Sequence, residues 1–98
     1  MRLDLTTESG CAEVDDGWVQ ERLQWAFGSY TAEIRNARVT FRPGEQGPRC
    51  AIRLTLRGRK VVFVDAPGRD YDDALRFAAQ RARAAVARRL DTERLLRG

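Results

Sequence analysis

The sequence predicts an α+β domain with the element order β-α-β-β-β-α, in which a four-stranded, mainly antiparallel sheet carries two helices on one face. Two segments have apolar residues at three- and four-residue spacing, which is typical of helices, and three others alternate apolar and polar residues, which is typical of strands. A fourth strand, 60–64, returns from the turn at Gly58-Arg59. Turns rich in Gly and Pro separate the strands of the second half. The 98 residues predict one domain, 1–98, because they are too few for two.

The first half of the chain is predicted to form one strand and one helix. Residues 1–6 form a half-buried strand in which Leu3 and Leu5 alternate with polar neighbours, and a loop follows over 7–14. A helix begins after an N-cap at Asp15 or Asp16 and ends at Phe27, because Gly and Ser follow. Its expected stripe consists of Trp18, Val19, Leu23 and Ala26, with the stem of Arg22 alongside.

Three strands are predicted next, over 34–41, 49–57 and 60–64. The Pro- and Gly-containing segment 43–48 is a turn by composition, and Gly58-Arg59 suits a two-residue type II′ turn. The first turn pairs Phe41 with Cys50 and Val39 with Ile52 on an inward face. The second turn places Val61 and Phe63 inward, opposite Leu56 and Leu54.

The same two hairpins are predicted to gather basic side chains on the other sheet face. Like charges directly across strands are destabilising, and acids are nearly missing between residues 35 and 60. We therefore expect a polyanionic partner to relieve the repulsion. The predicted pairs are Arg42 with Arg49, Arg38 with Arg53, and Arg57 with Lys60.

The last segment predicts a long helix that starts after an N-cap at Asp70 and ends near Leu90, followed by a short tail, 91–98, that can fray. Its apolar stripe is Tyr71, Ala74, Leu75, Ala78, Ala82, Ala85 and Val86. Arginines flank the stripe, and guanidinium groups bind phosphates bidentately. A merely solvated face in an Arg-rich chain is the alternative. The predicted RNA-binding arginines of this helix are Arg76, Arg81, Arg83, Arg88 and Arg89.

Composition and charge favour a partner rich in phosphate. The formal net charge is +4, and the positive charge is concentrated in 35–60 and 76–97, on either side of the acidic stretch 65–73. No apolar run approaches the length of a membrane span, and the N-terminus lacks the apolar region of a signal peptide. We therefore expect a soluble, cytoplasmic protein with no membrane partner.

The sequence argues against an enzyme and against a cofactor. It has no His, its two Ser lie in no nucleophile motif, and its Gly residues form no phosphate-binding loop. Cys11 and Cys50 cannot close a zinc site without further ligands, and Cys50 alternates with core residues. Asp70, Asp72 and Asp73 form the best carboxylate cluster for a metal, but acids at a helix N-terminus explain it more simply. The two Trp are interpreted as core or helix-cover residues, with base stacking by Trp25 as a weaker alternative.

The opening of the last helix resembles a known family. It reads Asp-Tyr-Asp-Asp-Ala-Leu from Asp70 and continues as a basic, Ala-rich helix. With the segments 34–41 and 54–64, this is similar to the short forms of the ribosome hibernation promoting factors, also called ribosome-associated inhibitors. The first helix departs from the family pattern, because it is short and acidic and its end is compressed at residues 27–30.

The resemblance implies a fold similar to double-stranded-RNA-binding domains. It also implies binding to the 16S rRNA of the small ribosomal subunit, in the channel of mRNA and tRNA, with translation halted under stress. The protein would be a monomer off the ribosome and would not bind DNA. Two alternatives remain open at this point. One is a general binder of structured RNA, and the other is a protein-interaction module whose basic face docks an acidic partner.

Overall fold

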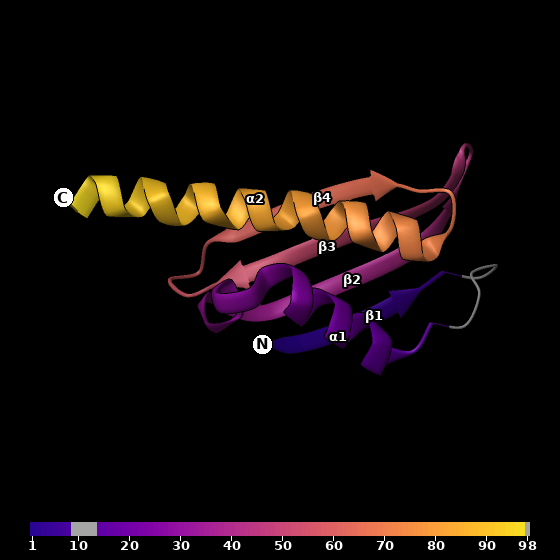
Figure 1. Cartoon of the computed structure of the whole chain (residues 1–98), viewed down its shortest axis with the longest axis horizontal. Coiled ribbons are helices and arrows are strands. Elements are labelled where there is room, and N and C mark those ends of the chain that lie inside the picture. Colours follow the sequence, from indigo (N-terminus) through magenta and orange to yellow (C-terminus); the bar gives the residue numbers. More distant parts are fainter. Residues whose placement is uncertain (9–13, 98) are drawn as a thin grey trace.

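The computed structural model describes residues 1–8 and 14–97, with side chains described up to Thr92. Four strands form one sheet in the order β1-β2-β3-β4; β1 runs parallel to β2 and the other pairs are antiparallel. Both helices lie on one face of this sheet, α1 near β1 and β2 and α2 over β3 and β4 (Figure 1). The predicted fold class is therefore confirmed. The elements are β1 (Arg2–Thr7), α1 (Asp16–Phe27), a 3-10 helix (Gly28–Glu33), β2 (Ile34–Gly44), β3 (Gly47–Leu56), β4 (Val61–Pro67) and α2 (Tyr71–Arg97).

The core lies between the helices and the covered face of the sheet. Along each strand every second residue points into it, so that Val39 and Ile52 face each other across β2 and β3 and are fully buried. Burial of this apolar area supplies most of the stabilisation. From the helices, Val19, Leu23, Phe27, Ala74, Leu75, Ala78, Ala79, Ala82 and Val86 complete the core.

Both helices begin at the predicted residues. The N–H of Gly17 donates to the Asp15 carboxylate at 3.2 Å, and the N–H of Asp73 donates to the Asp70 carboxylate at 2.8 Å. The end of α2 differs from the prediction, because the helix continues past Leu90 to Arg97. In Figure 1 its last turns project beyond the sheet. Nothing after Leu90 in the sequence breaks a helix before Gly98, so regular backbone hydrogen bonding can continue.

The β2–β3 hairpin has the predicted register with a shorter turn. Arg42 pairs with Arg49 and Arg38 pairs with Arg53, as expected. Pairing continues to Gly44 and Gly47, so the turn itself consists of residues 45–46 rather than 43–48. Gly47, the first residue after the turn, has a φ of 122°, a conformation that glycine adopts readily.

The β3–β4 hairpin was predicted with the wrong register. The loop holds three residues, 57–59, and both Gly58 and Arg59 have positive φ, so Val62 rather than Phe63 lies opposite Leu54. Val61 and Phe63 therefore point away from the core, with exposed fractions of 37% and 64%. The apolar run 61–64 contains no alternation, so the length of the turn alone decides which side chains face inward.

This shift also overturns the predicted pair of Arg57 and Lys60. The carbonyl of Lys60 accepts from the N–H of Leu56 at 2.8 Å, so Lys60 lies on the helix-covered side of the sheet together with Val62. Arg57 is in the turn, and its N–H donates to the carbonyl of Glu33 at 3.0 Å. Neither residue therefore joins the basic face formed by the middle strands.

Cys50 is fully buried, as its place in the alternation predicts, whereas Cys11 and Ser9 lie outside the described residues. Desolvation, with a smaller contribution from the charge of Asp65, raises the pKa of the Cys50 thiol from 9.0 to about 12. The fraction of Cys50 that is present as thiolate at neutral pH is therefore lower than that of an ordinary cysteine by a factor of about a thousand.

We expect the Cys50 thiol to resist alkylation in the native protein. A Cys11→Ser variant leaves Cys50 as the only thiol of the chain. Maleimide labelling at pH 7.5, followed by mass spectrometry, should be slower by at least about a hundredfold in buffer than in denaturant, because the thiol is both buried and protonated. Equal labelling rates in the two conditions would show that the sheet opens near Cys50.

Candidate nucleic-acid interface

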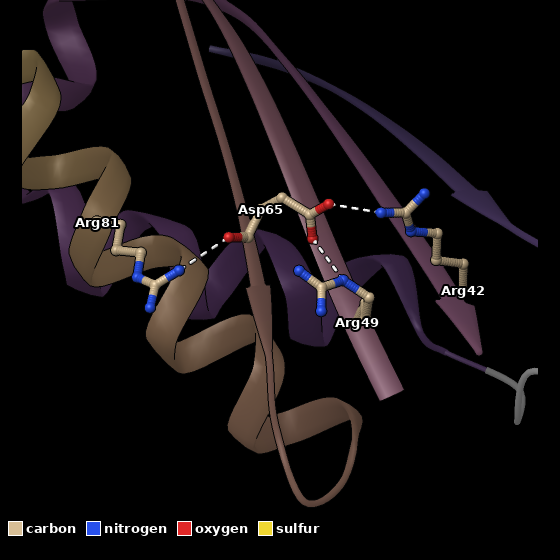
Figure 2. A network of polar contacts seen from close by, with 4 residues as sticks. All are labelled: Arg42, Arg49, Asp65 and Arg81. Atoms are coloured by element: carbon tan, nitrogen blue, oxygen red, sulfur yellow. Dashed lines mark hydrogen bonds and ion pairs between the residues drawn. The ribbon is translucent and has the colours of Figure 1, made fainter. Parts of the chain in front are cut away.

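The structure divides the predicted basic residues between two sides of the sheet. The open face carries those of the middle strands, and α2 carries its arginines on the helix-covered side (Figure 1). The two sets lie on opposite sides of the sheet and meet at Asp65 on the edge strand, which Arg42, Arg49 and Arg81 all contact (Figure 2). On the open face lie Arg38, Arg42, Arg49 and Arg53.

One arginine pair of the open face is neutralised within the chain. Asp65 on β4 accepts from Arg42 at 2.6 Å and from Arg49 at 3.2 Å (Figure 2). Both arginines are partly buried, so the carboxylate offsets the cross-strand repulsion that the sequence attributed to this pair. Asp65 was missed as a partner because the predicted strand ended at Val64 and Asp65 was assigned to the acidic stretch 65–73, whereas β4 continues to Pro67.

The second arginine pair has no such partner. Arg38 and Arg53 face each other across β2 and β3, both are exposed, and neither forms an ion pair within the described residues. Asp4 is the β1 neighbour of Arg38 and Phe63 is the β4 neighbour of Arg53. This row therefore carries net positive charge beside an exposed aromatic ring.

A shallow hollow of about 250 Å³ lies at the Arg38–Arg53 pair. Asn36 and Thr55 complete its lining, so every lining side chain is polar or cationic. The side-chain oxygen of Asn36 is buried and has no hydrogen-bond partner within the described residues. The hollow thus presents two cationic donors side by side, which suits a phosphate.

Two of the predicted α2 arginines bind groups of the protein itself. Arg76 forms an ion pair with Asp73 at 2.5 Å, and Arg81 donates to the backbone carbonyl of Asp65 at 2.9 Å (Figure 2). The second contact covers part of the free edge of β4, since Asp65 is on the edge strand. Arg76 and Arg81 are therefore partly committed to the fold.

The remaining α2 arginines line two different grooves. Arg83 lines a cleft of about 580 Å³ between α1 and α2, together with Arg22, Trp18 and Trp25. Trp25 is 84% exposed, so it is not a core or cover residue, and this exposure agrees with its place at the edge of the helix stripe. Arg88 and Arg89 line a groove of about 340 Å³ between α2 and β4.

The carboxylates at the start of α2 are each engaged by the chain. Asp70 caps the helix, and Asp72 lies 3.4 Å from Arg22 of α1. The backbone N–H of Arg69 donates to Asp73 and, with Arg76, holds the pKa of this carboxyl below its usual range. These contacts agree with the helix N-terminus interpretation of the acidic cluster.

Sequence reasoning also missed basic residues at the end of the molecule where β3 turns into β4. Arg35 is exposed and lines a hollow with Arg57 and Gly58, and Arg59 is exposed in the turn. Arg35 was not predicted because a register irregularity between Ile34 and Asn36 interrupts the alternation at the start of β2.

Within the described residues, no helix is long and apolar enough to cross a bilayer.

Fold and surface together define a small α+β protein with two helices on one face of a mixed sheet and an arginine pair on the other. Several solved structures share this fold. The N-terminal domain of Thermus thermophilus Protein Y matches with a TM-score of 0.72 and 23% identity, over 90% of this chain and 98% of that one. A ribosomal subunit interface protein from Coxiella burnetii matches with a TM-score of 0.75 and 12% identity, over 93% of this chain and 99% of that one. The resemblance indicated by the sequence is thus confirmed at the level of the fold.

No protein-family model matches the sequence, and no curated protein sequence matches it.

Proposed function

We propose that this chain is a ribosome-binding protein without enzymatic activity that docks on ribosomal RNA through the open face of its sheet. The observation that carries the proposal is the Arg38–Arg53 pair, which stays exposed and without an ion pair in the described residues while the next pair along the strands is neutralised by Asp65. The shared fold supports the ribosome as the partner, since one structural neighbour is named as a ribosomal subunit interface protein.

Arg38 and Arg53 hold two like charges side by side on the open face. Residues directly opposite in antiparallel strands have Cβ atoms about 5 Å apart, and a cationic pair there weakens the sheet. A phosphate between the two guanidinium groups removes the repulsion and accepts from both.

The finer assignment follows the family resemblance. The whole chain, 1–98, acts as one ribosome-binding domain that occupies the mRNA and tRNA channel of the small subunit. It blocks translation by occlusion and promotes hibernation under stress, so no covalent chemistry is needed. Off the ribosome it is a cytoplasmic monomer. Of the α2 arginines that are not committed to the fold, Arg83 provides a secondary contact on the other side of the sheet, whereas Arg88 and Arg89 line a separate groove beside β4.

Sedimentation with purified ribosomes on a sucrose gradient tests this function. At moderate salt we expect the protein to migrate with the small subunit and the intact ribosome at one copy per small subunit. The binding should fall steeply as salt rises, because phosphate contacts release counterions.

Two other results would contradict the proposal. Protein that remains at the top of the gradient even at low salt would point to an acidic protein partner. Unsaturable binding to ribosomes and to unrelated folded RNA alike would indicate a general RNA-binding protein.

A further inference from the structure

The free edge of β4 is only partly covered. In the first half of α2, the Arg81 side chain occupies the edge by donating to the carbonyl of Asp65 (Figure 2). Further along the helix, the residues on the same side are Ala85, Arg88 and Thr92, at helical spacing from Arg81. Ala85 is too small to reach the strand as Arg81 does, and a groove of about 340 Å³ lies there.

The backbone of β4 directs hydrogen-bonding groups into this groove. Leu56 donates to the carbonyl of Lys60, and Gly68 donates to the carbonyl of Pro48. Because bonded and non-bonded pairs alternate in an antiparallel ladder, Val62 and its alternate neighbours bond to β3. The N–H and C=O groups of Val61 and Phe63 therefore point outward, in the same direction as the Asp65 carbonyl that meets Arg81.

The exposed side chains of this edge are unusual for a strand that stays solvated. Native proteins commonly protect edges with charges, proline or a covering element. Here Arg81 and Pro67 protect the second half of β4, whereas Val61 and Phe63 leave the first half apolar and exposed. Arg88 and Arg89 line the groove on the helix side, and no acid is among its described lining residues.

We propose that this groove docks an extended, acidic peptide segment of a partner protein, which adds as a further strand beside β4. Its backbone would bond to Val61 and Phe63, and its carboxylates would face Arg88 and Arg89. A second copy of this chain fits less well, because pairing two β4 edges would bring the arginines of both copies together. The proposal is independent of RNA binding by the open face.

The test uses a capped, fluorescent peptide of about seven residues in which valine and glutamate alternate. We expect saturable binding by anisotropy and slower amide hydrogen exchange at Val61 and Phe63. Ala85→Arg fills the groove as Arg81 fills its own part of the edge, and should weaken binding by at least about tenfold. The matched control is Ala84→Arg, which adds the same side chain at an exposed position and should bind as wild type does.

Charge exchange gives a second, independent readout. The double variant Arg88→Glu, Arg89→Glu should lose the glutamate peptide and bind a peptide with lysine in place of glutamate. Unchanged exchange at Val61 and Phe63, or equal weakening by Ala84→Arg and Ala85→Arg, would overturn the proposal. The proposal would also be overturned if the peptide fails to bind while a single-stranded oligouridylate binds, and if Ala85→Arg abolishes the binding of that oligouridylate. The groove would then be a nucleic-acid site.

Discussion

The Arg53→Glu variant is expected to bind ribosomes more weakly by about 2 kcal/mol, about thirtyfold, and to be slightly more stable than the wild type. Binding weakens because one guanidinium contact to phosphate is replaced by repulsion. Stability rises by about 0.5 kcal/mol because the like-charged pair with Arg38 becomes an opposite-charge pair across the strands. Filter binding to small subunits and thermal unfolding measure the two effects separately.

The opposite signs of these effects distinguish a binding role from a structural one. The comparison variant is Arg83→Glu, which makes the same change in net charge at a proposed secondary contact on the other side of the sheet. If the open face carries the interaction, this variant should weaken binding by less than about threefold. Equal loss in both variants would mean that net charge alone governs association, and wild-type binding by Arg53→Glu would refute the open-face assignment.

Gly68→Ala is expected to destabilise the fold by about 3 kcal/mol, which corresponds to a lower Tm by roughly 15 °C for a domain of this size. A Cβ atom on Gly68 would lie 2.2 Å from the backbone nitrogen of Ala74 and 2.7 Å from its Cα. These are backbone atoms of the first turn of α2, which the Asp70 cap holds in place. The helix must therefore shift away from the sheet.

Thermal unfolding followed by circular dichroism checks this prediction. Gly17→Ala is the control, since the nearest atom to its added Cβ would be a side-chain oxygen of Asp15 at 3.6 Å. Alanine is the better helix former, so this variant should be more stable by about 0.5 kcal/mol. An unchanged Tm in Gly68→Ala would show that the junction of β4 and α2 relaxes without cost.

Predictions that depend on local patterns agree with the structure. In the two helix caps, the carboxylates of Asp15 and Asp70 accept from backbone N–H groups that are only two or three residues further along the chain. The adjacent sequence is therefore sufficient to identify these caps. The register of β2 and β3 follows from strict alternation in both strands. The arginine pairs of the open face were therefore predictable.

Only the tertiary structure determines which of the basic residues lie together. In β4 the run 61–64 is apolar throughout, so either face can turn inward, and the three-residue loop before it makes the choice. That choice exposes Phe63 and brings Asp65 to Arg42 and Arg49. No pattern along the chain contains this information.

The sequence by itself determined the order of the elements, the caps, the core alternation and the two basic blocks, because each depends on residues close together in the chain. The tertiary structure decided that these blocks lie on opposite sides of one sheet, and that Asp65 neutralises one arginine pair and leaves Arg38 and Arg53 exposed. The physical reason is that a charge is offset by its neighbours in space, and strand pairing brings those neighbours from distant parts of the chain.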